Sequence, residues 1–475
     1  MELSYCGSGK VFYDANSYQC NLYTNNEYGG ILVKIIVNNP VASFLEFPVE
    51  IEFLSGELST GFKFSLINCF RDNTTGLMSE GITEFSYVAQ YMLQGVGGKD
   101  CQNIKFYKVI FELSDIIWWG NISGYTIDER HKLSRNENCE MVLFSNNNFT
   151  IKYVVHRSLM PVVLDEILKE NITLKQKGNI EIIFKDEHTI EEYNAIIEKI
   201  IKLIELSILK KVYLTNINAF SKDVYFMVDD KKIEQTVNII NNRFNVKRDT
   251  ENEKSKKWKW VTLPELIENN SFEYYFNIYE KIEPIIELYI EIIESYKISN
   301  IGVFLNITQA LETYHSRFKA IGIEDFKKRI DEIILKNRPK ECIEKDRKFL
   351  LANSKSFVTL ESRIADLLIA DWDIIFDTGN IDFLDFPNVI AKTRNYYTHY
   401  DENIKDKFKV LTKEEITIYN RTLMYILEYY LLKELGFLDI EKMKQKLNER
   451  WGQISITLSV IDASKNLKKW FRYDK

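Results

Sequence analysis

The hydrophobic pattern of this 475-residue chain changes its period along the sequence, and this change constrains the fold more than any other feature. Up to about residue 186, short runs rich in β-branched and aromatic residues alternate with Asn, Gly and Asp clusters, as in strands and turns. From about Phe272 onward, apolar residues recur at helical spacing. This order predicts an α+β protein in which a β-rich N-terminal part precedes an all-α C-terminal part.

The N-terminal part is expected to fold as a sandwich or a curled sheet. Its expected strands lie at 31–39, 49–56, 61–70, 103–113, 148–155 and 179–186. Parts of EFSYVAQYMLQGVGG, at 84–98, could be helical instead. One helix is expected near 189–210, where Thr189 could cap it ahead of two glutamates. The runs KVYLT and DVYFMVD after this helix indicate two more strands.

The C-terminal part is expected to be a helical bundle with at least four long helices. The expected helices lie at 272–296, 300–319, 324–336, 357–371, 386–399, 412–435 and 439–451. Between the two parts, the mixed-charge stretch at 245–260 has no apolar period until its tryptophans and indicates a loop at a domain junction. The sequence therefore predicts a β-rich domain over residues 1–260 and an α-helical domain over residues 261–475.

Charge and cysteine content exclude several classes of protein. With 62 basic and 69 acidic residues the net charge is -7, so affinity for nucleic acid cannot come from overall charge, although a local basic site is compatible with it. The six cysteines show no metal-ligand spacing, so we expect reduced thiols, no metal and no cofactor. The N-terminus is polar and no apolar stretch reaches about 18 residues, so we expect a cytoplasmic protein without a membrane partner.

The candidate site lies in one expected helix, where Arg394-Asn395-Tyr396-Tyr397-Thr398-His399 separates an arginine from a histidine by four residues. With about 3.6 residues per turn, one stripe of this helix carries the polar residues Asn388, Lys392, Asn395 and His399. Arg394 lies about 140° around the helix from His399. The two side chains can therefore converge only through the long arginine side chain, a helix end near Thr398 or a second subunit. Further lysines follow, beginning with Lys405.

These side chains suit the cleavage of RNA, which carries its own nucleophile, the ribose 2′-hydroxyl, and does not require a metal. Histidine has an unperturbed pKa of about 6.5 and can move the protons. The arginine fork stays protonated, can donate two hydrogen bonds to a phosphate, and such a donor contributes about 3 kcal/mol to the transition state. Taken alone, an Arg and His at this spacing more often form a surface pair or a helix-end cap than a catalytic site.

The same residues resemble the HEPN superfamily of ribonucleases, whose signature is an Arg, usually followed by a polar residue, and then a His a few positions later. RNYYTHYD, the upstream FLDFPNVIAKT and the downstream ITIYNRTLMYILEYYLLKELG are similar to the HEPN domain of ApeA-like proteins. IGVFLNITQALETYHSRF is similar to the first part of that region. The resemblance is specific over about Phe272 to Gly436, and before that it rests on architecture.

This resemblance implies a bacterial antiphage-defence protein with an N-terminal sensor or regulatory domain and a C-terminal HEPN endoribonuclease. It implies a homodimer in which Arg394 and His399 of two copies face one cleft and cleave tRNA or other cellular RNA without metal, with abortive infection as the outcome. We expect Asn395, on the same stripe as His399, to orient the histidine or to bind phosphate. We expect Lys392 and Lys405 to bind the RNA and a phage-derived trigger to be a further partner.

Two other functions stay open. The helical part could be a HEPN-like dimerisation or RNA-binding module whose Arg–His pair is structural, or the chain could be an adaptor in which the β domain carries the function. Glu312, His315 and Arg317 are interpreted as structural residues, with His315 packed or hydrogen-bonded near the bundle surface. Tyr400 could be a core or interface residue or a base-stacking platform.

Overall fold

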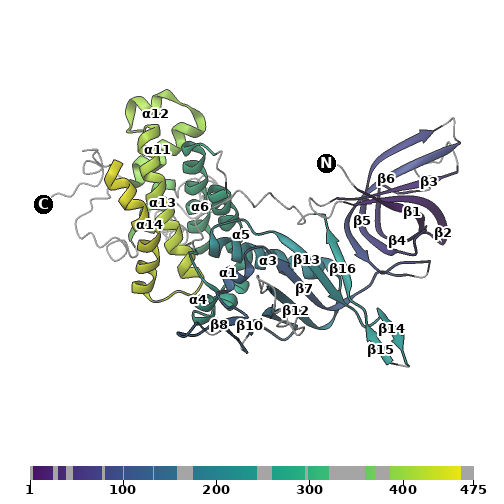
Figure 1. Ribbon diagram of the computed structural model, residues 1–475. Helices are drawn as coiled ribbons and strands as arrows, with labels where there is room; N and C mark the ends of the chain where they lie inside the picture. The colour runs from purple at the N-terminus through teal and green to yellow at the C-terminus, as the bar shows by residue number, and fades with distance from the viewer. Residues whose placement is uncertain are drawn as a thin grey trace, which may run out of the picture. The chain divides into compact units, whose positions relative to one another are not determined.

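The computed structural model describes residues 4–24, 30–38, 47–77, 81–99, 101–131, 133–137, 139–157, 175–229, 231–242, 259–294, 298–319, 359–369 and 386–461. Its contacts divide the chain into two compact units, which are described one at a time (Figure 1). The first unit comprises Met1–Ile204, Val212–Trp258 and Thr262–Pro264. The second comprises Glu205–Lys211, Lys259–Val261 and Glu265–Lys475.

The first unit is built on one sheet of twelve strands, in the order β10-β11-β12-β7-β13-β16-β6-β3-β2-β1-β4-β5. Neighbouring strands run antiparallel throughout this order. The bounds are β1 Ser4–Tyr13, β2 Asn16–Thr24, β3 Ile31–Val37, β4 Glu50–Leu58, β5 Lys63–Leu77, β6 Ile82–Gln94, β7 Phe106–Leu113, β10 Glu140–Ser145, β11 Phe149–Arg157, β12 Gln176–His188, β13 Leu214–Phe220 and β16 Val237–Asn241.

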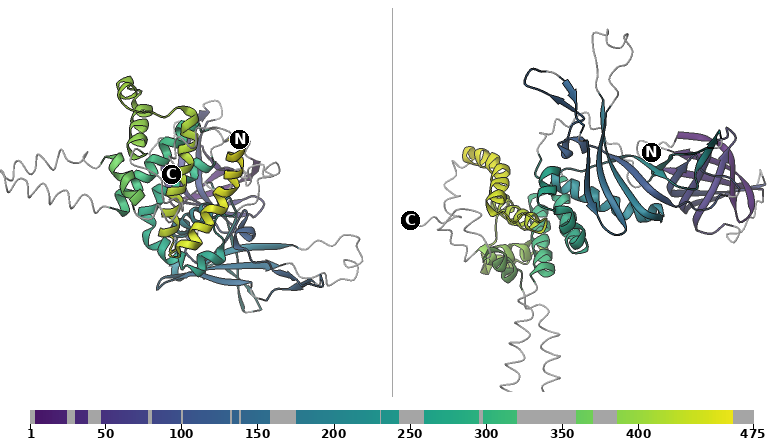
Figure 2. Two further views of the ribbon diagram at one scale, coloured as in Figure 1. Left: turned by 90° about the vertical axis from the view of Figure 1, so that its left-hand side faces the viewer. Right: turned by 90° about the horizontal axis from the view of Figure 1, so that it is seen from below.

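Six of these strands close into a barrel, because β5 pairs with β6 as well as with β4 (Figure 2). Buried and partly buried residues alternate along β3, so one face of the strand points into the barrel. The ring of Phe47 is completely buried among the rings of Tyr13, Tyr18 and Phe85. At Gly9 a Cβ would lie 2.2 Å from the carbonyl oxygen of Glu57, so β1 approaches β4 too closely there for any side chain. The barrel is therefore a packed core.

The β-rich N-terminal region predicted from the sequence is confirmed, and its sheet curls far enough to close at one end. The partly helical alternative for residues 84–98 is wrong over β6, which pairs with β3 along one edge and with β5 along the other. Two stretches of β6, Phe85–Tyr87 and Tyr91–Leu93, are buried on both faces, so its sequence lacks the alternation that would have identified a strand.

The rest of the first unit adds short elements to the large sheet. It contains α1 Ile116–Gly120 and the part of α3 Ile190–Ile208 that precedes Glu205. It also contains two hairpins, β8 Tyr125–Ile127 with β9 Leu133–Arg135 and β14 Tyr225–Val228 with β15 Lys231–Glu234. Helix α3 confirms the helix expected near 189–210, and its Tyr193 hydroxyl donates to the carbonyl of Phe106 on β7 at 3.1 Å. At its start the N–H of Thr189 donates to the carboxylate of Glu192 at 2.9 Å, one half of the expected capping box.

Every element that the structure describes in the second unit is a helix, which confirms the predicted helical C-terminal region. The bounds are α4 Leu263–Glu268, α5 Ser271–Glu294, α6 Asn300–Phe318, α9 Leu360–Ile369, α11 Phe386–His399, α12 Glu402–Lys407, α13 Lys413–Glu434 and α14 Ile440–Ile461. Helix α6 packs against α5, α9, α11 and α13. The helix expected at 324–336 and nearly all of the loop expected at 245–260 lie outside the described residues.

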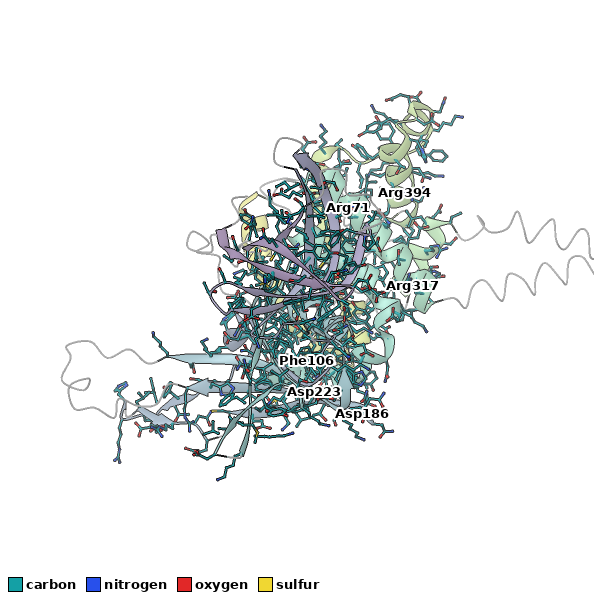
Figure 3. All side chains as sticks on the ribbon, turned by 90° about the vertical axis from the view of Figure 1, so that its right-hand side faces the viewer. Arg71, Phe106, Asp186, Asp223, Arg317 and Arg394 are labelled. Atoms are coloured by element: carbon teal, nitrogen blue, oxygen red, sulfur yellow. The ribbon has the colours of Figure 1, made fainter. Side chains whose placement is uncertain are left out.

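Within this helical unit, polar side chains pair with two groups that would be costly to leave unpaired: a carbonyl opposite a proline and a buried carboxylate. Pro284 lies inside α5 and cannot donate a hydrogen bond to the carbonyl of Glu280. Arg317 of α6, which is labelled in Figure 3, donates to that carbonyl at 2.7 Å. Glu428 of α13 is completely buried, where it accepts from the hydroxyl of Tyr289 and pairs with Arg450 at 2.9 Å. Arg317 therefore has the structural contact that the sequence analysis expected.

Candidate active site

Helix α11 carries the candidate residues and buries one of its faces. Its buried residues are Phe386, Pro387, Val389, Ile390, Ala391 and Thr393. Pro387 fits the first turn, where its missing N–H leaves no hydrogen bond unmade. The ring of Phe386 stacks on Tyr419 of α13 with centroids 5.4 Å apart. The other face keeps Lys392, Arg394 and Asn395 partly exposed and His399 exposed.

The segment that follows α12 returns to α11 and fixes its rotation. The N–H of Leu411 donates to the Thr393 hydroxyl at 3.1 Å, and the Tyr397 hydroxyl donates to the Leu411 carbonyl at 3.0 Å. Burial, followed by the neighbouring phenols of Tyr396 and Tyr400, raises the pKa of Tyr397, so this hydroxyl stays protonated as a donor. These two contacts bracket Arg394 within one helical turn.

Arg394 contacts Asn395, the residue that shares a stripe with His399. Its Nη1 donates to Asn395 Oδ1 at 3.5 Å, which is a long hydrogen bond, and its carbonyl accepts from the Thr398 hydroxyl at 2.8 Å. His399 is the last residue of α11, and among the described residues its imidazole makes no hydrogen bond, ion pair or ring contact. The structure thus brings Arg394 and Asn395 together and leaves His399 free of both.

A carboxylate on α6 lies beside the site, and no local sequence pattern indicated its contact with Arg394. Glu312 Oε2 is 3.8 Å from Arg394 Nη2, and Glu312 Oε1 is 3.9 Å from Nε of Arg363 on α9. Glu312 was interpreted as a structural residue of its helix, and its ion pairs could not be read from the sequence because they join helices that are far apart in the chain. The similarity of LETYHSRF to the HEPN region was the only local signal that marked this segment.

His315, one turn after Glu312, is packed and hydrogen-bonded as expected. Its Nε2 is 2.9 Å from Oδ2 of Asp366 on α9, and the residue is only 2% exposed. The expected packing and hydrogen bond are confirmed: α9 covers the imidazole, while the side chain of its partner Asp366 is half exposed. With its ring enclosed, His315 cannot contact a polynucleotide directly.

The two candidate RNA-binding lysines both lie over aromatic rings near the end of α11. Nζ of Lys392 is 4.2 Å from the ring centroid of Phe408. Nζ of Lys405 is 5.7 Å from the ring centroid of Tyr396 and 3.7 Å from the carboxylate of Glu402. These cation–π contacts hold two positive charges beside the exposed end of the helix.

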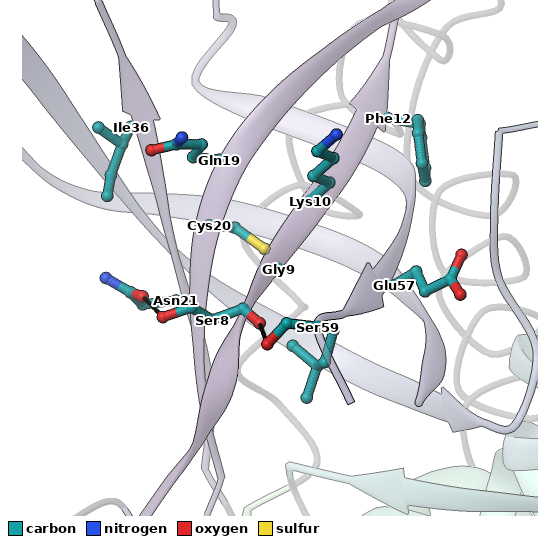
Figure 4. Close-up of a pocket in the computed structure, with 11 residues that line it drawn as sticks. Ser8, Gly9, Lys10, Phe12, Gln19, Cys20, Asn21, Ile36, Glu57 and Ser59 are labelled. Atoms are coloured by element: carbon teal, nitrogen blue, oxygen red, sulfur yellow. Dashed lines mark hydrogen bonds between the residues drawn. The ribbon is translucent and has the colours of Figure 1, made fainter. Parts of the chain in front are cut away.

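A concave region of about 520 Å³ also lies on the barrel of the first unit (Figure 4). Lys10 faces Glu57 across the paired strands there, and the Ser8 hydroxyl donates to Asn21 at 2.7 Å. Burial raises the pKa of the Cys20 thiol to about 12, so it is not a nucleophile at neutral pH. The lining therefore combines hydroxyl and amide groups with one amine and one carboxylate, and it contains no histidine.

Two further properties concern only the part of the chain that the structure describes. No three His, Cys, Asp or Glu side chains in these ranges lie close enough together to hold one metal ion. Among the same residues, no helix combines the length and the apolar character needed to cross a membrane.

Two family models match the chain. ApeA N-terminal domain 1 matches residues 8–278, more than half of the chain, and Apea-like HEPN matches residues 305–439. The second match contains Glu312 and the whole of α11, and it begins later than the Phe272 inferred from the sequence. Neither a curated protein nor a solved structure matches the chain. The resemblance seen in the sequence is confirmed, and the chain belongs to the ApeA family, with an Apea-like HEPN domain in its helical C-terminal region.

Proposed function

We propose that this protein is a metal-independent endoribonuclease of bacterial antiphage defence. The observation that carries the proposal is the exposed end of α11, where Arg394, Asn395 and His399 lie on one helix within the Apea-like HEPN match. HEPN domains are usually ribonucleases, and the side chains at this helix end supply a proton-transfer group and a phosphate-binding cation.

The reaction uses the RNA's own 2′-hydroxyl. His399 takes the proton from this hydroxyl while its oxygen attacks the neighbouring phosphorus. The bond from phosphorus to the 5′-oxygen breaks, and the leaving oxygen receives a proton from an acid. The products are a 2′,3′-cyclic phosphate and a 5′-hydroxyl. One imidazole cannot conveniently serve both sides of the phosphorus, so a second copy of the chain supplies the acid. HEPN domains commonly dimerise, which supports this arrangement.

Arg394 is the phosphate clamp in this proposal. Its ion pair with Glu312 spans 3.8 Å between side chains that are each about one-third exposed, so it contributes at most about 1 kcal/mol. A phosphodiester can displace such a pair, because the arginine fork binds two phosphoryl oxygens at once. Asn395 holds the guanidinium, and Lys392 and Lys405 bind neighbouring phosphates.

The remaining features of the proposal concern the whole protein. We divide it into a β-rich sensor or regulatory domain, residues 1–260, and a helical bundle domain, residues 261–475. Because unrestrained cleavage of cellular RNA would kill the host, we assign the restraint to the first domain and its release to a phage-derived trigger. tRNA is the substrate class that the family resemblance favours, with abortive infection as the outcome.

The site is tested by His399→Ala and Arg394→Ala in the full-length protein. Each should abolish cleavage of a total tRNA preparation, while the unfolding temperature stays unchanged because both side chains reach the surface. His156→Ala, which removes another exposed histidine, is the matched control and should retain activity. Full activity in either site variant would refute the assignment, and loss of wild-type activity in EDTA would refute metal independence.

A non-catalytic HEPN-like module for dimerisation or RNA binding is the second candidate function. It is favoured by the ion pair between Arg394 and Glu312, which gives the arginine a structural partner, and by the lack of a contact between Arg394 and His399 within one copy. RNA binding of equal affinity in wild type and His399→Ala, with no cleavage product in either, would support this candidate.

A further inference from the structure

The end of α11 has a backbone conformation that its residue disfavours. Tyr400 follows the last helical residue with φ of 51°, in the left-handed region, and its N–H donates to the Tyr396 carbonyl at 2.5 Å. After α13 the chain also enters the left-handed region, but at a glycine, Gly436, with φ of 85°. Glycine and asparagine are the usual residues there, because a Cβ is strained in this region. Folding alone therefore does not favour a tyrosine at position 400.

Packing does not account for the Tyr400 ring either. The residue is 63% exposed. Its ring meets those of Tyr396 and Tyr397 near edge-to-face, with centroids 5.8 Å and 6.1 Å apart and planes at 61° and 86°. Neither neighbour stacks on it in parallel. Because Tyr396 and Tyr397 are themselves held through their hydroxyls by Glu402 and Leu411, they brace the ring without burying it.

Cations and exposed aromatic rings lie near this ring, and these are the groups that bind the phosphate and the base of a nucleotide. His399 precedes it directly in the chain. Lys392 and Lys405 lie over the nearby rings of Phe408 and Tyr396, and Phe408 is itself 43% exposed. Proteins that bind single-stranded nucleic acid combine cations along the backbone with aromatic rings on which bases stack.

We propose that the Tyr400 ring stacks an unpaired base beside the scissile phosphate, so that the site takes single-stranded or looped-out RNA rather than a duplex. This inference rests on the proposed function of the same helix end. A base inside a duplex already has both faces stacked on its neighbours, and only an unstacked base can lie on the ring. The site tolerates any base, because stacking reads no hydrogen-bond edge.

The test uses the full-length protein and a short single-stranded oligoribonucleotide in which every 2′-hydroxyl is methylated, so that no cleavage occurs. Binding is followed by fluorescence anisotropy. Tyr400→Gly removes the ring and places at this position the residue that the backbone prefers. Its Tm should equal or exceed the wild-type value, while Kd for the single strand rises roughly 5- to 150-fold, the range for the loss of one stacked base. Tyr400→Phe should bind like wild type.

Two controls separate stacking from other effects. Tyr274→Ala removes another exposed tyrosine of the helical unit and should leave Kd unchanged. A blunt duplex of the same sequence should bind equally to wild type and Tyr400→Gly. Light scattering on each variant reports whether the number of copies in the assembly changes.

Equal single-strand affinity of Tyr400→Gly and wild type would overturn the inference. Conversion of Tyr400→Gly to a smaller assembly would overturn it too, because the ring would then be a contact between copies. The proposed function fails by a different result: if wild type binds the single strand through Tyr400 and yet cleaves no RNA, the stacking site stands and the ribonuclease does not.

Discussion

Charges in the barrel and charges at the end of α11 are balanced in different ways. In the barrel, oppositely charged residues face each other one to one: Lys34 contacts Glu84 at 2.9 Å, and Lys10 lies opposite Glu57 on the paired strand. At the helical site one carboxylate, that of Glu312, lies near two arginines, Arg363 and Arg394. In these barrel pairs each charge has one opposite charge beside it, whereas at the candidate site two guanidinium groups share one carboxylate.

Among the variants that test the comparison between the barrel and the helical site, the largest loss of stability is expected in the barrel core. Phe47→Ala should lower the free energy of unfolding of the barrel by about 3–5 kcal/mol, because a fully buried ring among three others leaves a cavity. Hydrogen exchange of the β1–β6 amides measures this change. The matched variant Phe226→Ala, at a position 47% exposed on β14, should change stability by less than about 0.5 kcal/mol. Equal effects of the two would show that the barrel interior is not the stabilising core.

A smaller effect, on affinity for RNA, is expected where one carboxylate pairs with two arginines. Glu312→Gln should tighten binding of the methylated single strand by up to about 5-fold, since it removes an exposed pair worth at most about 1 kcal/mol that competes for Arg394. Anisotropy at rising salt measures it, and the gain should fade as the charges are screened. Glu361→Gln, at an exposed position on α9, is the control. Weaker binding in Glu312→Gln would instead identify the carboxylate as a support that positions Arg394.

The smallest effect concerns a carboxylate at the start of α3. The hydrogen bond from the Thr189 N–H, followed by that from His188, lowers the pKa of Glu192. Its stabilising effect is therefore complete above the unfolded pKa of about 4.3 and is lost as the pH falls through the lower folded value. Glu192→Gln should lower stability by at most about 0.5 kcal/mol at pH 7, after solvent screening, and by less in acid.

Urea unfolding of wild type and Glu192→Gln, at pH 7 and again in acid, measures the loss of stability at each pH. Glu50→Gln, at an exposed position of β4, is the control. A penalty for Glu192→Gln that stays constant, or grows, as the pH falls would contradict the assignment of the shift to the ionised carboxylate.

Local sequence patterns predicted the elements better than their long-range pairing. The helical spacing of α11 and the strand pattern of β3 are properties of neighbouring residues, and both elements were expected close to their observed bounds. Closure of the barrel depends on β5 pairing with β6 and β1 pairing with β4, and no local pattern encodes which strands meet. β6 was ambiguous because two stretches of it are buried on both faces.

At the candidate site, too, local features were predictable from the sequence and contacts between distant segments were not. The spacing of Arg394 and His399 identified the helix end, and the contact between Arg394 and Asn395 is local. The contacts of Glu312 with two other helices, and the burial of His315 under α9, depend on how distant segments pack. The left-handed backbone of Tyr400 had no sequence signal, because tyrosine is not a residue that marks such a position.

Strand β6 has a practical consequence for anyone who wishes to study the first unit in pieces. One edge of this strand is divided: Thr83–Val88 pair with β3 of the barrel, and Tyr91–Gln94 pair with β16 of the open sheet. Its other edge is paired with β5 along its whole length. A fragment that contains the barrel without the open sheet, or the reverse, therefore leaves backbone N–H and C=O groups unpaired at a strand edge, and such edges promote aggregation. Truncation experiments should treat β1 through β16 as a single indivisible piece.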